Sequence, residues 1–154
     1  MKIFVTGNAG SGKTTLARRI AKERRLPYYT LDSIVWKSGW KKTAQEEKKQ
    51  KIAALTAEEC WVIDGVSHDV MAAADIVYFL DVPRYRCILN ILRRFLRYGW
   101  KTRPDFPSDC PEYIGVLKAL RIAWLFPRKG RQHILFFNGR RKLVRLRDGR
   151  AYKA

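Results

Sequence analysis

Short apolar runs and longer amphipathic stretches alternate along the chain. The apolar runs contain β-branched and aromatic residues, and most are followed directly by Gly or Asp. Such runs are typical of strands that are buried on both faces of a parallel sheet. The pattern predicts strands at residues 2–6, 26–31, 60–63, 76–80 and 142–146.

Apolar residues spaced three and four positions apart fill the segments between these runs, which predicts helices there. Leu16 and Ile20 have this spacing in the first segment, and Pro27 follows it. Thr43 and Glu46 match a capping box, in which the two side chains bond to the first free N–H groups of a helix. The predicted helices are 15–25, one opening at 43–46 and running towards 59, then 84–98, 112–126 and a shorter one at 132–137.

Strands that alternate with helices indicate βαβ units, and therefore an α/β fold with a parallel sheet covered on both faces. In such sheets the ligand binds at the carboxyl ends of the strands. The residues expected at these ends are Gly7, Asp32, Asp64, Asp81 and Arg147. We therefore expect the functional site along this edge.

The most specific motif lies where the first predicted strand ends. Residues 7–14 match G-x-x-x-x-G-K-[ST], the phosphate-binding P-loop, between a strand and a helix as the motif requires. Its glycines let backbone N–H groups turn inward around an anion, and the helix adds its positive N-terminal end. We expect Lys13 to reach the β and γ phosphates of ATP and the Thr14 hydroxyl to bind Mg²⁺. The alternative is a glycine-rich turn without a ligand. The expected nucleotide-binding residues are Gly7, Asn8, Ala9, Gly10, Ser11, Gly12, Lys13, Thr14 and Thr15.

Length and composition favour one folded domain over residues 1–154, since 47% of the residues are hydrophobic. No apolar run approaches the length of a membrane span, and the chain enters its first strand at once, so we expect no signal peptide. Cys60, Cys87 and Cys110 follow no pairing pattern. Reduced thiols in a cytoplasmic protein are the expected state.

The charge of the chain is +18, from 32 Lys and Arg against 14 Asp and Glu, and it is unevenly placed. No acidic residue stands between Asp81 and Asp105, and Asp148 is the only acid after Lys118. Nucleotides, nucleic acid or anionic surfaces are therefore expected partners, and a basic surface that contacts only solvent is the alternative.

Two acids are candidates for the chemistry of phosphoryl transfer. Asp64 follows four apolar residues, as does an acid that holds Mg²⁺, although an Asp at a strand end also caps turns. Asp32 is expected at the neighbouring strand end, where it would orient or deprotonate an acceptor hydroxyl or contact the shell of the metal. Its alternative role is to cap the helix that follows.

Arginines and tryptophans complete the candidates. Arg93, Arg97 and Arg103 flank a proline-rich segment, where guanidinium groups on a closing lid would cover the phosphates of ATP; Arg94 is a weaker candidate. A solvated helix face is the alternative for each. Trp36 and Trp40 would either line an acceptor pocket or simply pack.

Together with the P-loop, several short motifs resemble the adenylate-kinase-related P-loop proteins of the DNA topology modulation (FlaR) group. The resemblance runs from Met1 to about Asp148, but Val66, Ser67 and His68 stand where the group has an Asn, an aromatic residue and a nearby Arg. It implies a three-layer, nucleoside-monophosphate-kinase-like fold with a five-stranded parallel sheet, an acceptor region at about 33–59, a lid at about 93–111, and use of ATP and Mg²⁺. The motifs are D-x-x-x-W-x-x-x-W from Asp32, WVIDG from Trp61, FLDVPR from Phe79, TRPD from Thr102, CPE from Cys110 and W-x-F-P from Trp124.

Two functions are consistent with these residues. The first is an enzyme, an ATP-dependent kinase of a small acceptor such as a nucleotide. The second is a nucleic-acid-binding ATPase or regulator that affects DNA topology, since aromatic residues are interleaved with the basic ones. The protein is expected to be a monomer or a homodimer, with an exposed segment 124–126 as the dimer contact.

Overall fold

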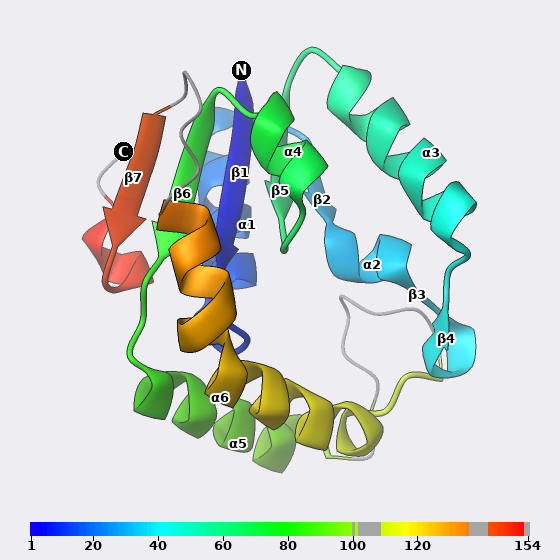
Figure 1. Ribbon diagram of the computed structural model, residues 1–154, viewed down its shortest axis with the longest axis vertical. Helices are drawn as coiled ribbons and strands as arrows, with labels where there is room; N and C mark the ends of the chain where they lie inside the picture. The colour runs from blue at the N-terminus through cyan, green and yellow to red at the C-terminus, as the bar shows by residue number, and fades with distance from the viewer. Residues whose placement is uncertain (100, 102–108, 136–141, 153–154) are drawn as a thin grey trace.

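Five parallel strands form the central sheet of the computed structural model, which describes residues 1–99, 101, 109–135 and 142–152 (Figure 1). Their order is β2-β5-β1-β6-β7, and every neighbouring pair is parallel. In this register Val5 stands opposite Asp64, and Gly7 stands opposite Leu80. The predicted α/β class and the five-stranded parallel sheet are confirmed. The strands are β1 (Lys2–Gly7), β2 (Tyr28–Thr30), β5 (Trp61–Asp64), β6 (Ile76–Leu80) and β7 (Lys142–Leu146).

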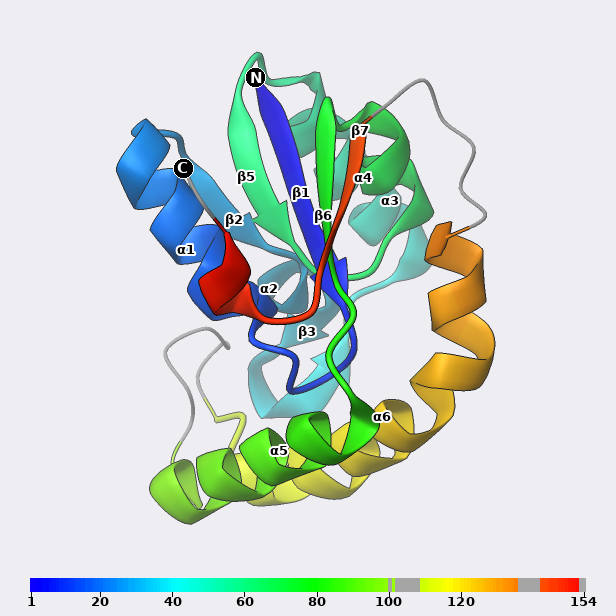
Figure 2. The same cartoon turned by 90° about the vertical axis from the view of Figure 1, so that its left-hand side faces the viewer.

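Helices cover both faces of the sheet, which gives three layers (Figure 2). Because side chains alternate along a strand, Ile3 and Val5 contact one helical layer and Phe4 contacts the other. The first layer is α1 (Lys13–Arg24), which buries Leu16 and Ile20, together with the short 3-10 turn η2 (Gly149–Ala151). The second layer is α3 (Gln45–Ala57), α4 (His68–Ala73) and the carboxyl-terminal part of α6 (Glu112–Leu135).

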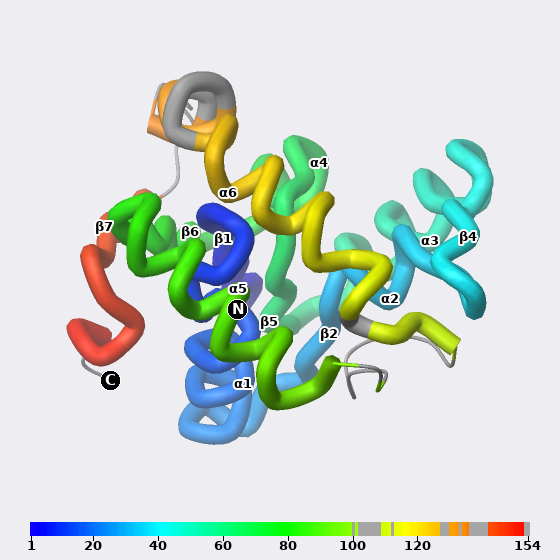
Figure 3. The backbone as a smooth tube through the Cα atoms, turned by 90° about the horizontal axis from the view of Figure 1, so that it is seen from below, coloured from blue at the N-terminus to red at the C-terminus, as the bar shows by residue number. Residues whose placement is uncertain are grey.

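Below the carboxyl ends of the strands, α5 (Arg84–Tyr98) and the first half of α6 lie side by side (Figure 3). Their shared core is made by Cys87 and Ile91 of α5 with Val116 and Ala123 of α6. The predicted helix at 84–98 is confirmed with the same bounds. This pair of helices forms the floor beneath the edge of the sheet where ligands are expected.

A small hairpin connects the second strand to α3. It follows α2 (Leu31–Val35) and consists of β3 (Trp36–Lys37), the 3-10 turn η1 (Ser38–Trp40) and β4 (Lys41–Lys42). The expected capping box before α3 is wrong. The Thr43 hydroxyl instead donates a 2.6 Å hydrogen bond to the carbonyl of Ile34, and α3 begins after Ala44 without a side-chain cap.

Two further expectations are corrected. The strand predicted at 26–31 is shorter, because Leu31 already belongs to α2, so Asp32 lies in the first turn of that helix rather than at the strand end. The two helices predicted at 112–126 and 132–137 are one helix, α6, whose late residue Ile134 is buried in the core under the sheet. The docking of this last part onto the sheet extends the helix beyond Pro127. Within the described residues, no helix combines the length and the apolarity that a membrane crossing needs.

Candidate functional site

The P-loop follows β1 and leads into the first turn of α1, as the motif predicts. Gly10 and Gly12 have positive φ angles of 74° and 92°, the region that glycine adopts most readily. The loop closes with a hydrogen bond from the Ser11 N–H to the carbonyl of Asn8. All the expected nucleotide-binding residues, Gly7 through Thr15, therefore lie in one continuous turn and the helix start that follows it.

Neighbouring elements hold this loop closely. A Cβ atom on Gly10 would lie 2.4 Å from the carbonyl oxygen of Cys87, so only glycine lets α5 approach this near. Asn90 of α5 donates a 2.9 Å hydrogen bond to the carbonyl of Gly10, and the Asn8 amide donates one of 3.0 Å to the carbonyl of Ala123 in α6. The contact through Asn90 was missed by the sequence analysis, since its partner lies 80 residues away.

Two polar atoms of the loop region are buried without a hydrogen-bond partner among the described residues, Asn8 Oδ1 and Ser11 Oγ. Buried polar atoms are paired in most structures, so an orphan often marks a place where water or a ligand binds. The Ser11 hydroxyl lies inside the P-loop itself. This residue fits a loop that receives hydrogen-bonding oxygens from a phosphate.

Lys13 lies over the loop and donates a 2.7 Å hydrogen bond to the carbonyl of Asn8. Burial lowers the pKa of Lys13, and the negative charges of Asp64 and Asp32 raise it, with the net shift downward. The ammonium group is thus short of hydration and lies near two carboxylates. Burial disfavours the charged form of Lys13, and an anionic oxygen bound beside its ammonium group would stabilise that form.

A hydroxyl and a carboxylate meet at the start of α1. Thr14 Oγ1 donates a 2.6 Å hydrogen bond to Asp64 Oδ2, and the Tyr28 hydroxyl donates one of 3.1 Å to Asp64 Oδ1. Asp64 is only 3% exposed. Oxygen donors of this kind suit Mg²⁺, which binds one or two protein oxygens and keeps several waters or phosphate oxygens. The described residues contain no cluster of three or more His, Cys, Asp or Glu side chains that could hold a metal.

The remaining catalytic candidates are placed differently. Asp32 is exposed in the first turn of α2, and its charge reaches Lys13. Arg93 and Arg97 lie on the exposed surface of α5, whereas Arg94 is half-buried and its charge lowers the pKa of Lys13. Arg94 is therefore the arginine of α5 whose charge acts on the P-loop lysine. Arg103 lies outside the described residues.

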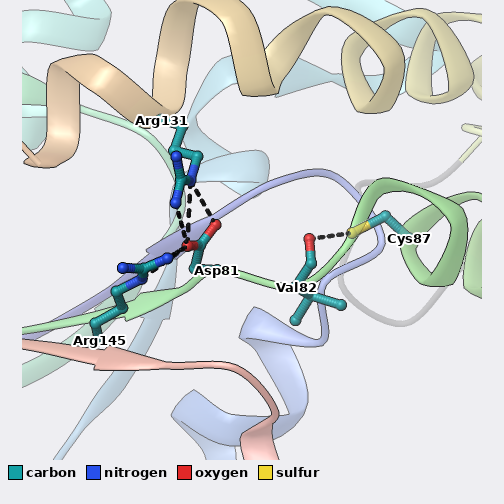
Figure 4. Close-up of polar contacts among 5 residues, drawn as sticks. All are labelled: Asp81, Val82, Cys87, Arg131 and Arg145. Atoms are coloured by element: carbon teal, nitrogen blue, oxygen red, sulfur yellow. Dashed lines mark hydrogen bonds and ion pairs between the residues drawn. The ribbon is translucent and has the colours of Figure 1, made fainter.

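A second charged cluster stands at the end of β6 (Figure 4). Asp81 accepts hydrogen bonds of 3.0–3.2 Å from Arg131 and one of 2.7 Å from Arg145. Burial raises the pKa of Asp81, but the bonds from the two arginines outweigh it and hold the pKa below its ordinary value. A cavity of about 360 Å³ adjoins this cluster and is lined by Asn8, Leu80, Asp81, Val82, Pro83, Arg84, Phe126 and Arg131.

The two tryptophans of the hairpin pack against α6. Trp40 Nε1 donates a 3.2 Å hydrogen bond to the carbonyl of Pro111, and a Cβ atom on Gly115 would lie 2.5 Å from the Trp40 ring. Trp36 meets the Trp40 ring edge to face, and Lys118 Nζ lies 3.8 Å from the centre of the Trp36 ring. Trp40 therefore packs against α6, which is one of the two roles considered for it. Together, Trp36 and Trp40 join the hairpin to the start of α6.

No protein-family model matches the sequence, and no curated protein matches it either. Solved structures do match. The shikimate kinase from Bacteroides thetaiotaomicron gives a TM-score of 0.51 at 18% identity, covering 97% of this chain and 86% of that one. The shikimate kinase from Acinetobacter baumannii, in complex with shikimate, gives 0.56 at 15% identity, covering 96% and 84%. An uncharacterized protein from Eubacterium ventriosum gives 0.51 at 14% identity, covering 97% and 92%.

At these identities the likeness concerns the architecture of the chain. The chain shares with these structures a five-stranded parallel sheet that has helices on both faces. The chain has the fold of these shikimate kinase structures.

Proposed function

We propose that this protein is an ATP-dependent kinase that transfers a phosphoryl group to a small acceptor. The observation that carries the proposal is the Thr14–Asp64 pair, a hydroxyl and a buried carboxylate 2.6 Å apart at the start of α1. It lies beside a P-loop whose Lys13 is poorly hydrated. A glycine-rich turn without a ligand would not need a buried acid at this place.

The P-loop backbone and Lys13 bind the phosphates of ATP in this proposal, and Lys13 exchanges the carbonyl of Asn8 for a phosphate oxygen. Thr14 and Asp64 hold Mg²⁺, which would neutralise charge on the phosphates. Arg94 adds positive charge near Lys13, and Arg93, Arg97 and Arg103 belong to the lid at about 93–111. The lid covers the phosphates and excludes water.

Asp32 is proposed to orient or deprotonate the hydroxyl of the acceptor. It is exposed, its charge acts on Lys13, and it directly precedes the proposed acceptor region at about 33–59, which supports this role. The acceptor is a small molecule with a hydroxyl or phosphate group, either a nucleotide or a hydroxy acid. The shikimate kinase structure that contains shikimate supports the second class by its fold alone.

The experiment is ADP release from Mg-ATP, measured with a panel of nucleoside monophosphates, nucleosides and small hydroxy acids. Lys13→Ala is the blank. Thr14→Ser keeps the hydroxyl and is expected to remain active, whereas Thr14→Val and Asp64→Asn are expected to lose on the order of 100-fold in Mg²⁺-dependent turnover. Absence of saturable Mg-ATP binding at millimolar concentration would overturn the proposal.

A second candidate is the nucleic-acid-binding ATPase or regulator of DNA topology. It is favoured by the chain's charge of +18 and by the arginines on α5, and by the sequence resemblance to the topology modulation group. It predicts ATP turnover that duplex DNA stimulates and that no small acceptor stimulates, together with DNA binding that weakens steeply as salt increases.

A further inference from the structure

The outer face of α5 carries a row of exposed apolar side chains. Tyr85, Leu89, Leu92 and Leu96 are spaced by four, three and four residues, so they lie on one side of the helix. Leu96 is 83% exposed. The opposite side of the same helix already packs against α6 and the P-loop through Cys87 and Ile91. The helix therefore has two apolar faces, and the outer one has no partner among the described residues.

A row of arginines runs beside this apolar row. Arg86, Arg93 and Arg97 are spaced by seven and four residues, and all three are exposed. Residues 84–98 contain five arginines and no acid. The outer surface of α5 thus presents leucines along one line and guanidinium groups along the next.

The neighbouring helix extends the apolar row. The two helices run antiparallel, since the Arg84 guanidinium lies 4.5 Å from the centre of the Trp124 ring and the Tyr113 N–H bonds to the carbonyl of Gly99. On α6 the exposed apolar residues Tyr113, Leu117 and Trp124 are spaced by four and seven, hence on one side, with Leu117 75% exposed. Lys118 and Arg121 of α6 are exposed as well. Figures 2 and 3 show the pair side by side at the base of the molecule, and among the described residues no helix or strand lies below it.

We call this surface the basal platform: Tyr85, Leu89, Leu92, Leu96, Tyr113, Leu117 and Trp124, with the exposed basic residues Arg86 of α5 and Arg121 of α6. Arg93 and Arg97 are left out of it, because they belong to the lid proposed above. An apolar surface of this kind on a folded chain marks an interaction site. The positive charge of the basal platform indicates which kind of partner fits it. A second copy would bring an identical row of arginines on a chain of charge +18, and a nucleic acid would satisfy the arginines but leave the leucines in water.

We propose that the basal platform docks on a membrane surface rich in anionic lipids. A bilayer surface offers both complements at once, headgroup phosphates for the arginines and the acyl boundary for the leucines and aromatic rings. Association is peripheral, with the two helices lying in the plane of the surface. The inference goes beyond the proposed kinase function and does not depend on it, because binding is measured without ATP.

The test is sedimentation of the full chain with vesicles of phosphatidylcholine alone and vesicles of equal parts phosphatidylcholine and phosphatidylglycerol. We expect binding to the anionic vesicles, weakening with salt, and none to the neutral ones. The double variant Leu96→Gln with Leu117→Gln keeps the charge and is expected to bind roughly tenfold more weakly or worse. Arg86→Gln tests the charged row and is expected to weaken binding by about fivefold.

The matched control is Val66→Gln, which removes an apolar side chain that is 64% exposed on a different segment, and it should bind as the parent does. Circular dichroism of each variant establishes that it is folded. Three results would overturn the proposal: no binding to anionic vesicles at low salt, unchanged binding of the leucine variant, or a dimer in light scattering that the leucine variant converts to a monomer.

Discussion

The side chain of Asn90, in the middle of α5, donates a 2.9 Å hydrogen bond to the carbonyl of Gly10 in the P-loop. Together with the close approach of Gly10 to Cys87, it joins the helix proposed to carry lid arginines to the loop proposed to hold the phosphates. A movement of α5 would therefore act directly on the shape of the phosphate-binding loop.

Replacing Asn90 by Ala is expected to remove this link. We expect a loss of about 0.5–1.5 kcal/mol in the free energy of unfolding, and weaker binding of ATP because the loop is less ordered before binding. Urea unfolding and calorimetric titration with ATP measure the two effects. Leu89→Ala, a truncation on the outer side of the same helix, should leave ATP affinity unchanged. Equal ATP affinity for Asn90→Ala and the parent would contradict the role given to this bond.

The lowered pKa of Lys13 predicts how stability depends on pH. Between that lowered pKa and 10.5, the unfolded chain binds a proton at Lys13 that the folded chain does not, so raising the pH through this range stabilises the fold. Lys13→Met has no ammonium group to bury, so its stability lacks both this cost and this dependence on pH. Without ATP it is expected to be more stable than the parent at neutral pH, by a margin that narrows as the pH rises towards 10.5. Urea unfolding of both proteins at several pH values measures the margin, and a margin that widens with pH would refute the assignment.

Asp81 is expected to make stability rise with pH as well, but in the acid range. Its pKa in the folded chain is held below 3.8, so its contribution is present at neutral pH and is lost as the pH falls through 3.8 and then through the folded pKa. Arg131 and Arg145 are each more than a third exposed, and solvent screens the interaction. Asp81→Asn is therefore expected to lose about 1–2 kcal/mol at pH 7, and progressively less in acid.

The matched control for this prediction is Glu47→Gln. Glu47 pairs with Lys37 and Lys51 on the exposed surface, so its replacement should change the unfolding midpoint much less. Chemical unfolding at neutral and acid pH gives both comparisons. A constant difference between Asp81→Asn and the parent across this range would show that the arginines do not act through the charge of Asp81.

Gly115 permits the contact between the hairpin and α6. Alanine in an open helix position usually stabilises by about 0.5–1 kcal/mol, but here its Cβ would lie 2.5 Å from the Trp40 ring, a clash that costs about 1–3 kcal/mol. We expect Gly115→Ala to destabilise the parent and to stabilise the Trp40→Ala variant. Thermal unfolding of the four proteins of this cycle tests the contact, and the same effect of Gly115→Ala in both backgrounds would contradict it.

The strands, the P-loop and the helix α5 follow from local patterns, because hydrophobic periodicity and the glycine motif are written into a few neighbouring residues. The residues that contact the site from distant parts of the chain do not follow from such patterns. Tyr28 bonds to Asp64 across 36 positions and Asn90 to Gly10 across 80, and nothing in the residues around Tyr28 or Asn90 indicates these contacts.

The hairpin escaped prediction for a similar reason. Its strands have two residues each, too few for a periodic pattern, and Trp40 is fixed by the carbonyl of Pro111, which lies 71 positions along the chain. Asp32 lies in a helix rather than directly after the strand, because the side chain of Thr30 accepts the Asp32 N–H and caps α2 there. Among the lid candidates, the sequence ranks Arg94 below Arg93 and Arg97, whereas tertiary packing brings the charge of Arg94 to Lys13.

The central position of β1 bears on how the protein acquires its nucleotide site. β1 pairs with β5 and β6, whose partner residues come 59 and 73 positions later, so the strand that supports the P-loop is held by contacts distant in the chain. Contacts of such sequence separation form slowly, because the entropy of closing a long loop is lost before the contact is gained. A nascent chain that has emerged only through the P-loop and α1 contains every residue of the motif yet lacks both flanking strands. The nucleotide binding proposed above is therefore expected to await β6, the second of the two strands that flank β1, and β7 joins the sheet only afterwards.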